Sequence, residues 1–125
     1  MALAETKQSV LNSETLESLE SLQIEGEPDL VFEIFSIFIE NAAERLASMD
    51  RLASLAQLQD LSMEAHALKS SARAIGALNL GKMCEQLEFH PEQGLGAEKL
   101  LEKLHSEMNL VIIELKKHKP ALSNF

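Results

Sequence analysis

The amino-acid sequence predicts an all-α fold, an antiparallel four-helix bundle with an additional short N-terminal helix. Of the 125 residues, 46% are hydrophobic and 25% are charged, the balance of a chain that folds around a core. Strand-forming aromatic residues are scarce, because Trp and Tyr are absent and aromatics reach only 4%. Several segments instead carry apolar residues at steps of three and four. Helices with one apolar stripe and short connections bury those stripes as a bundle.

One domain is expected over residues 1–125, with residues 1–12 loosely ordered and residues 13–119 forming the helical bundle. The segment NSETLESLESL predicts a short first helix with Asn12 or Ser13 as its N-cap. Pro28 then suits the first turn of a long second helix.

The second helix should have a wide apolar surface. Residues at helical spacing form its main stripe: Val31, Ile34, Phe35, Phe38, Ala42, Leu46, Met49 and Ala53. Three further apolar residues widen it, namely Phe32, Ile37 and Ile39. Such a helix can contact two neighbouring helices, and we expect the N-terminal helix to cover these three additional apolar residues.

The third helix has a clear stripe and an unclear start. Around residues 56–60 the apolar pattern shifts phase without a Gly or Pro to mark a boundary. The helix should run to about Ile75, where Gly76 can supply a C-terminal cap or a close helix approach.

Two more helices complete the bundle. Asn79 is expected to cap a helix over roughly residues 80–89, and the segment FHPEQGLG, with Gly94 and Gly96, is typical of a turn. A last helix should end before Pro120. Its final residues include a cationic cluster that favours the helix dipole, to which we assign no function: Lys116, Lys117 and Lys119.

The composition argues against several classes of partner. The formal net charge of −9 repels a nucleic acid backbone and an anionic membrane surface. No run of about 18 apolar residues occurs, and the start MALAETKQSV lacks a basic segment followed by an apolar run. We therefore expect a cytoplasmic protein that binds neither nucleic acid nor membrane. Cys84 is the only cysteine, which excludes an internal disulfide and predicts a small buried side chain.

The third helix should carry a histidine on its outer face. Lys69, Ser70 and Arg73 lie within roughly 60° of His66 around a helix. The apolar stripe is centred roughly 140° away from His66 and consists of Leu61, Ala65, Leu68, Ala72 and Ile75. His66 therefore points outward together with two cations.

These cations suit phosphoryl chemistry. They favour a neutral, nucleophilic imidazole and would stabilise a negative group arriving on its ring nitrogen. Phosphoryl fits better than acyl, because phosphoryl transfer asks the protein mainly for positioning and charge compensation. A solvated histidine without function remains an alternative at this point, because histidine is often exposed on helices.

Two enzyme classes are excluded by what the sequence lacks. A hydrolytic triad fails because Glu64 lies roughly 160° around the helix from His66 and the nearby serines sit in no strained turn. No Gly-x-x-x-x-Gly-Lys run is present for ATP. Any phosphoryl group must therefore come from another protein.

The stretch HALKSSARAIGA resembles the signature of histidine phosphotransfer domains, usually His-x-Leu-Lys-Gly-Ser followed by Gly-Ala. The residues in register are His66, Leu68, Lys69, Ser71, Gly76 and Ala77. The next segment, LGKMCEQLE, resembles the family's following helix, with a Leu-x-x-x-Cys-x-x-Leu-Glu pattern at Leu80, Cys84, Leu87 and Glu88. The resemblance covers roughly residues 10–117 and points to the histidine phosphotransfer domains of bacterial two-component phosphorelays.

This resemblance implies a phosphocarrier rather than an enzyme with an ATP site. His66 would be phosphorylated and would pass the group to or from an aspartate on a response-regulator receiver domain. A hybrid histidine kinase is a second implied partner. Lys69 takes the family's place beside the phosphate. No cofactor or metal is expected here, because Mg²⁺ in such exchanges belongs to the receiver's acidic pocket.

Two positions near the histidine refine this expectation. Ser70 stands where the family usually has Gly, so transfer should survive with a narrower choice of partners. Ala67 stands where dimeric sensor kinases usually carry an acidic residue, which argues against a kinase dimerisation domain. Arg73 and Lys82 would join Lys69 in a basic cluster that steers the receiver's acidic pocket.

Other classes remain as alternatives. A docking or inhibitory module could bind a kinase or receiver without carrying phosphate. A helical-bundle metal protein is a remote alternative, suggested by Glu102 and His105 three positions apart, but no second such pair exists. A dimeric scaffold is a third, although one self-sufficient bundle favours a monomer.

Overall fold

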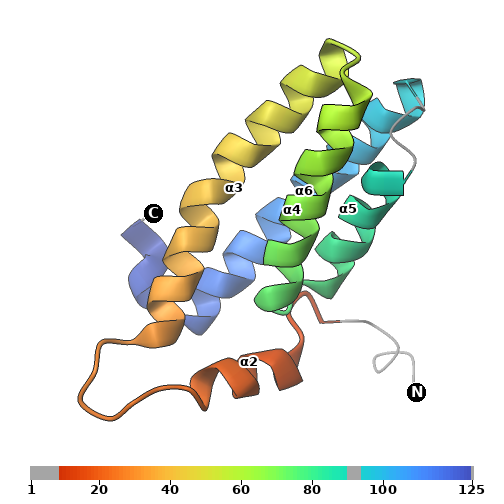
Figure 1. Ribbon diagram of the computed structural model, residues 1–125. Helices are drawn as coiled ribbons and strands as arrows, with labels where there is room; N and C mark the ends of the chain where they lie inside the picture. Colours follow the sequence, from red (N-terminus) through yellow and green to blue (C-terminus); the bar gives the residue numbers. More distant parts are fainter. Residues whose placement is uncertain (1–8, 90–93, 125) are drawn as a thin grey trace, which may run out of the picture.

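The computed structural model describes residues 9–89 and 94–124. In this part of the chain it contains helices and no strand. The elements in order are α2 (Ser13–Glu20), α3 (Leu30–Ser54), α4 (Leu58–Ala74), α5 (Leu78–Phe89), α6 (Gly94–His118) and the short 3₁₀ helix η1 (Pro120–Asn124). Figure 1 shows α3, α4, α5 and α6 side by side, with α2 across one end of them. The predicted all-α bundle with an additional N-terminal helix is confirmed.

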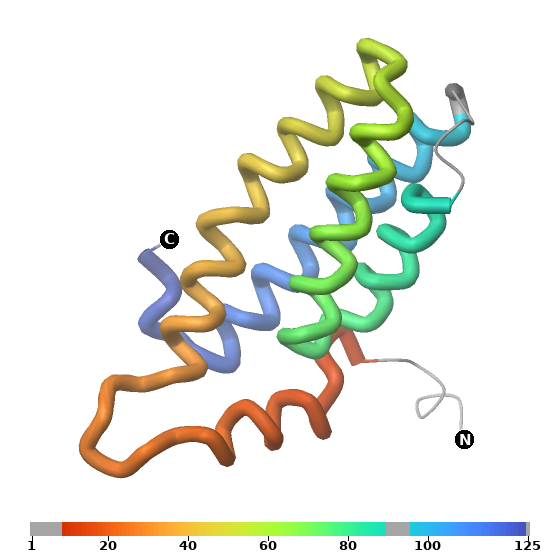
Figure 2. The backbone as a smooth tube through the Cα atoms, viewed as in Figure 1, coloured from red at the N-terminus to blue at the C-terminus, as the bar shows by residue number. Residues whose placement is uncertain are grey.

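Neighbouring helices of the bundle run antiparallel. The backbone tube in Figure 2 passes along α3, returns along α4, and repeats this course with α5 and α6. Short turns after α3 and α4 make this arrangement possible, because they leave no length for a crossover. None of the described helices is long and apolar enough to cross a membrane.

Side-chain caps set the starts of α2 and α3. The Asn12 side chain accepts a hydrogen bond from the Thr15 amide at 2.8 Å, which confirms it as the N-cap of α2. Asp29 caps α3 by accepting from the Phe32 amide at 3.1 Å. Pro28 therefore precedes the cap, and its predicted place in the first turn is wrong. The carboxylate of Asp29 binds the free amide that defines the helix start.

An alanine in the left-handed region ends α3. Ala56 has a φ of 56°, and the Gln57 amide donates to the Leu52 carbonyl at 2.9 Å. The Ala56 amide donates to Ala53 at 3.1 Å, which completes a Schellman motif with Ala in the position that Gly usually holds. This explains why no Gly marks the boundary in the sequence.

The turn after α4 uses the same motif with a glycine. Gly76 has a φ of 84°, and the Ala77 amide donates to the Ala72 carbonyl at 2.8 Å. The predicted C-terminal cap is thus present. The prediction that Asn79 caps the next helix is wrong, because α5 begins at Leu78. The Ala77 carbonyl already accepts from the Gly81 amide at 3.0 Å, which places Asn79 inside the helix.

The start of α6 differs from the predicted turn. Gly94 and Gly96 lie in the first turn of α6, and the predicted turn residues 90–93 lie outside the described residues, as do residues 1–8 of the predicted loose segment. Glycine is mainly unfavourable in a helix interior, so the first turn tolerates it. At the other end, α6 stops at His118, before Pro120, as predicted.

Charged side chains tie α2 to the ends of α3 and α6. Lys119 Nζ pairs with Asp29 at 3.0 Å and with Glu20 at 3.2 Å, and His118 Nε2 lies 3.0 Å from Glu20. We call these four residues the end network. The His118 hydrogen bond, with a further contribution from Lys119, lowers the pKa of Glu20. The capping bond from the Phe32 amide, with Lys119, lowers the pKa of Asp29.

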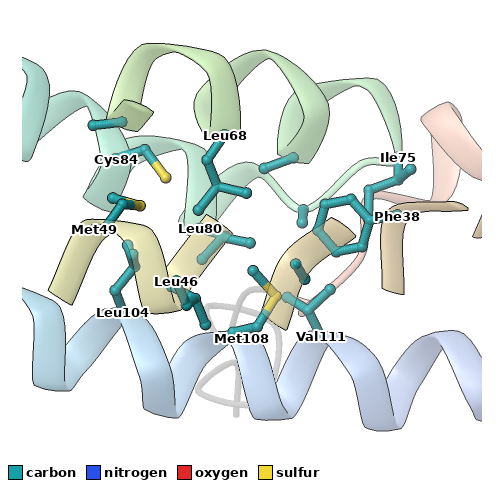
Figure 3. Close-up of a cluster of buried hydrophobic side chains, with 14 of the residues drawn as sticks. Phe38, Leu46, Met49, Leu68, Ile75, Leu80, Cys84, Leu104, Met108 and Val111 are labelled. Atoms are coloured by element: carbon teal, nitrogen blue, oxygen red, sulfur yellow. The ribbon is translucent and has the colours of Figure 1, made fainter. Parts of the chain in front are cut away.

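The core lies between the four bundle helices (Figure 3). The labelled side chains are Phe38, Leu46, Met49, Leu68, Ile75, Leu80, Cys84, Leu104, Met108 and Val111. Cys84 is buried as predicted, and burial raises the pKa of its thiol to about 12. Phe32 and Ile39 pack partly against the core, whereas Ile37 stays 56% exposed. The prediction that the N-terminal helix covers Ile37 is wrong, because α2 lies across the end of the bundle (Figure 1).

Candidate functional site

The outer face of α4 presents His66 to solvent. Its side chain is 60% exposed, and Ser70 and Arg73 are exposed on the same side of the helix. Lys69 differs from this prediction, because it is only 8% exposed. Its position, roughly 60° around the helix from His66, turns it towards α5. The predicted face therefore holds three exposed residues and one buried lysine at its margin.

A carboxylate on α5 joins the histidine and the lysine. Glu88 Oε2 lies 2.7 Å from His66 Nδ1, and Glu88 Oε1 lies 2.6 Å from Lys69 Nζ. The Ser62 hydroxyl donates to the Glu88 backbone carbonyl at 2.6 Å, which fixes this part of α5 against α4. One carboxylate therefore binds both residues that were predicted to carry the chemistry.

The charge on Glu88 is maintained by its two partners. The hydrogen bond with Lys69, and then that with His66, lower the pKa of the Glu88 carboxyl, although burial opposes them. Glu88 is thus ionised at neutral pH. The sequence predicted only the cations Lys69 and Arg73 beside the His66 ring, and it missed the Glu88 carboxylate.

The carboxylate also determines which ring nitrogen is free. An ionised carboxylate only accepts hydrogen bonds, so His66 Nδ1 must carry the proton that the two atoms share. In the neutral imidazole the lone pair then lies on Nε2, on the opposite side of the ring. The arrangement leaves a nucleophilic nitrogen pointing away from Glu88, on an exposed side chain.

Sequence reasoning missed the role of Glu88, but a signal for it exists. In two antiparallel helices joined by a tight turn, residues equally far from the turn lie opposite each other. His66 precedes Ala77 in the turn by as many positions as Glu88 follows it. The spacing could therefore have paired His66 with Glu88 once the turn at Gly76 was recognised.

The remaining basic residues lie further along α4 and α5. Arg73 Nη2 reaches Glu85 at 3.6 Å, and its stem packs on Gly81, where an added Cβ would lie 3.1 Å from Arg73 Cγ. Lys82 is exposed and lines a hollow near the start of α2 with Ser9, Asn12 and Ser13. Lys82 thus follows in the chain the glycine on which Arg73 packs, and none of the contacts described for it involves His66.

Beyond His66, towards the C-terminal end of α4, the side chains on this face are small, whereas Met63, one turn before His66, is 65% exposed. Ser70, Ser71 and Ala74 are exposed, and Ala67 is half-buried. The Ser70 hydroxyl donates to the His66 carbonyl at 3.3 Å, so it lies against its own helix. A partner can therefore approach the ring closely.

The alternative metal site has a different arrangement from the one its pattern suggested. His105 Nε2 lies 2.9 Å from Asp50 on α3. Among residues 9–89 and 94–124, no three His, Cys, Asp or Glu side chains gather as a metal site. Within these residues, Glu102 and His105 therefore belong to no group of three such side chains that could hold an ion.

Comparison with known proteins identifies the family of this chain. The sequence model of the Hpt domain matches residues 33–116, which include His66, Lys69 and Glu88. The chain belongs to the Hpt domain family. Histidine-containing phosphotransfer protein 2 of Arabidopsis thaliana is 32% identical over 69 residues, which are 53% of this chain. The matched region spans only 44% of that relative's length.

The fold of this Hpt domain is also found in a solved structure. The crystal structure of a histidine-containing phosphotransfer protein from Medicago truncatula superimposes with a TM-score of 0.73 at 23% sequence identity. The superposition covers 96% of this chain and 88% of the other. At this identity the likeness shows a common fold.

Proposed function

We propose that this Hpt domain carries a phosphoryl group on His66 and exchanges it with the aspartate of a response-regulator receiver domain. The observation that carries the proposal is the 2.7 Å contact between Glu88 and Nδ1 of an imidazole that is 60% exposed. This contact leaves Nε2 as the free nucleophile, facing the side from which a partner must come. Family membership supports the same reading.

In the proposed transfer, the Nε2 lone pair attacks the phosphorus of the receiver's aspartyl phosphate. The N–P bond forms, the P–O bond to the aspartate breaks, and the aspartate leaves as a carboxylate. Because Nδ1 keeps its proton, the ring becomes cationic as the bond forms. Glu88 lies against that proton and offsets the new charge. The reverse sequence returns the group to an aspartate.

Lys69 is proposed to offset charge on the phosphoryl oxygens. Its ammonium has three N–H donors, and it forms an ion pair with Glu88 Oε1 at 2.6 Å. Its N–H groups would also reach the oxygens of a group on Nε2 of His66. Because Lys69 is largely buried, its charge acts in surroundings where water screens it less.

The partner is proposed to dock over the small side chains beyond His66 on α4. Ser70 and Arg73 would contact the receiver, and Lys82 would extend the basic edge beyond Gly81. This edge is a local exception in a chain of net charge −9, so it would orient an acidic pocket towards the histidine. A hybrid histidine kinase is proposed as the upstream source of phosphate, and the domain is proposed to act as a monomer.

The test is transfer of radiolabelled phosphate from receiver domains to the wild-type protein and to His66→Gln. His105→Gln is a matched control, because it removes a second, 44% exposed histidine that also contacts a carboxylate. We expect an acid-labile, alkali-stable label that His66→Gln loses and His105→Gln keeps. A folded wild-type protein that binds receivers but takes no label would instead be a phosphate-independent docking module.

A further inference from the structure

An exposed aromatic side chain lies beside the proposed phosphoryl site. Phe89 is the last residue of α5 and is 60% exposed. Lys69 Nζ lies 5.5 Å from the centroid of its ring. This distance is within the range of a cation–π contact, in which the ring face attracts an ammonium ion. Phe89 therefore contacts the proposed site without belonging to the core.

Lys69 needs more than one partner to stay near His66. Its side chain is long and flexible, and Glu88 is the charged group that holds its ammonium, at 2.6 Å. When a phosphoryl group occupies His66 Nε2, the ammonium must turn some of its donors towards the new oxygens. A ring contact is compatible with that movement, because it is uncharged and does not depend on one donor direction.

We infer that Phe89 is a positioning residue that holds the Lys69 ammonium beside His66 during phosphoryl transfer. The inference rests on the proposed function and extends it to a residue that neither the composition nor the motif singled out. Glu88 fixes one side of the ammonium and Phe89 covers another, so that Lys69 stays largely buried at the edge of an exposed site. Without the ring, Lys69 would spend more time extended into water, away from the phosphoryl oxygens.

A first experiment tests the contact without any phosphate. The ε-methylene resonances of Lys69, assigned by their loss in Lys69→Met, should be shifted upfield in the NMR spectrum by the Phe89 ring. Phe89→Leu should return them to ordinary lysine values, and Phe89→Trp should keep them shifted. Leu78→Ala, which removes a 42% exposed apolar side chain from the other end of α5, should leave them unchanged. Resonances that Phe89→Leu does not move would overturn the inference.

A second experiment tests the role in transfer. Phe89→Leu should slow transfer from a receiver about two- to fivefold, as expected for loss of a cation–π contact at an exposed position, and Phe89→Trp should restore the rate. In the Lys69→Met background, Phe89→Leu should have no further effect, because the ring acts through the lysine.

The two experiments separate the inference from the proposed function. An equal slowing by Phe89→Leu in both backgrounds would overturn the positioning role, because Phe89 would then act by touching the receiver. A wild-type protein that takes no label at all would overturn the proposed function, whereas an unshifted Lys69 resonance overturns only the positioning role. Since Phe89 is exposed, its replacement should leave the melting temperature nearly unchanged.

Discussion

Replacing Gly76 by alanine tests how the turn between α4 and α5 holds the site together. Gly76 has a φ of +84°, and a Cβ there would lie 3.1 Å from Thr15 Cβ and 3.2 Å from the backbone N and O of Asn12. The Asn12 amide also donates to the Gly76 carbonyl at 2.8 Å. The substitution therefore strains the turn and crowds the start of α2 at the same time.

The expected loss of stability follows from these contacts. A left-handed conformation costs an L-residue about 1–2 kcal/mol, and weakening the Asn12 hydrogen bond costs about 1 kcal/mol more. Alanine restricts the unfolded chain, which returns about 0.5–1 kcal/mol. The net loss is about 2 kcal/mol for Gly76→Ala, which corresponds to a melting temperature lower by roughly 6–10 °C.

Ala56→Gly is the matched control, because Ala56 holds the same place in the same motif at a φ of 56°. Here glycine relieves the strain of about 1–2 kcal/mol and loses about 0.5–1 kcal/mol through the freer unfolded chain. The variant should melt a few degrees higher than wild type. Urea and thermal unfolding would measure both variants. A Gly76→Ala protein as stable as wild type, or an Ala56→Gly protein that is less stable, would refute the reasoning.

Three further predictions concern the site and the ends of the bundle. Glu88→Ala should slow phosphoryl transfer to His66 about tenfold or more, whereas Glu88→Gln should keep part of the rate because an amide oxygen still accepts from Nδ1; equal rates in both variants would contradict the orienting role. Ser70→Gly should keep transfer and broaden the set of receivers served, so that identical rates across a receiver panel would contradict the partner-choice role. The pKa values of Glu20 and Asp29 are lowered in the folded protein from their ordinary values of 4.5 and 3.8. The two ionised carboxylates therefore stabilise the folded protein at pH values above these ordinary pKa values, and this stabilisation is lost as the pH falls through the lowered pKa values. Lys119→Met should flatten part of this acid dependence in unfolding measured from pH 7 to pH 2, because the His118 and Phe32 hydrogen bonds remain; an unchanged profile would show that Lys119 contributes nothing to it.

The sequence predicted those parts of the fold that depend on local signals. Helical spacing located the long helices, Asn12 marked the start of α2, and Gly76 marked the end of α4. The end of α3 could not be located, because Ala56 adopts a conformation that alanine rarely takes. Pro28 was placed in the first turn of α3 although it precedes the Asp29 cap, because either Pro28 or Asp29 suits a helix start and only the capping bond decides.

For the candidate site too, the sequence predicted what depends on one helix and missed what depends on the packing of two helices. Periodicity alone placed His66 on the outer face of α4, opposite the core stripe. The burial of Lys69 and its pairing with Glu88 depend on how α5 packs against α4. The sequence pattern of a single helix does not contain this information. Phe89 was missed for the same reason, since its ring meets Lys69 only across that interface.

The central claim is that Glu88 holds Nδ1 of His66 and leaves Nε2 to take the phosphoryl group. The most direct measurement is NMR of the phosphorylated protein with ¹⁵N-labelled histidine, which identifies the ring nitrogen bonded to phosphorus. The account predicts phosphorus on Nε2 of His66 and a proton on Nδ1, in contact with the Glu88 carboxylate. Phosphorus on Nδ1, or on any other residue, would contradict it.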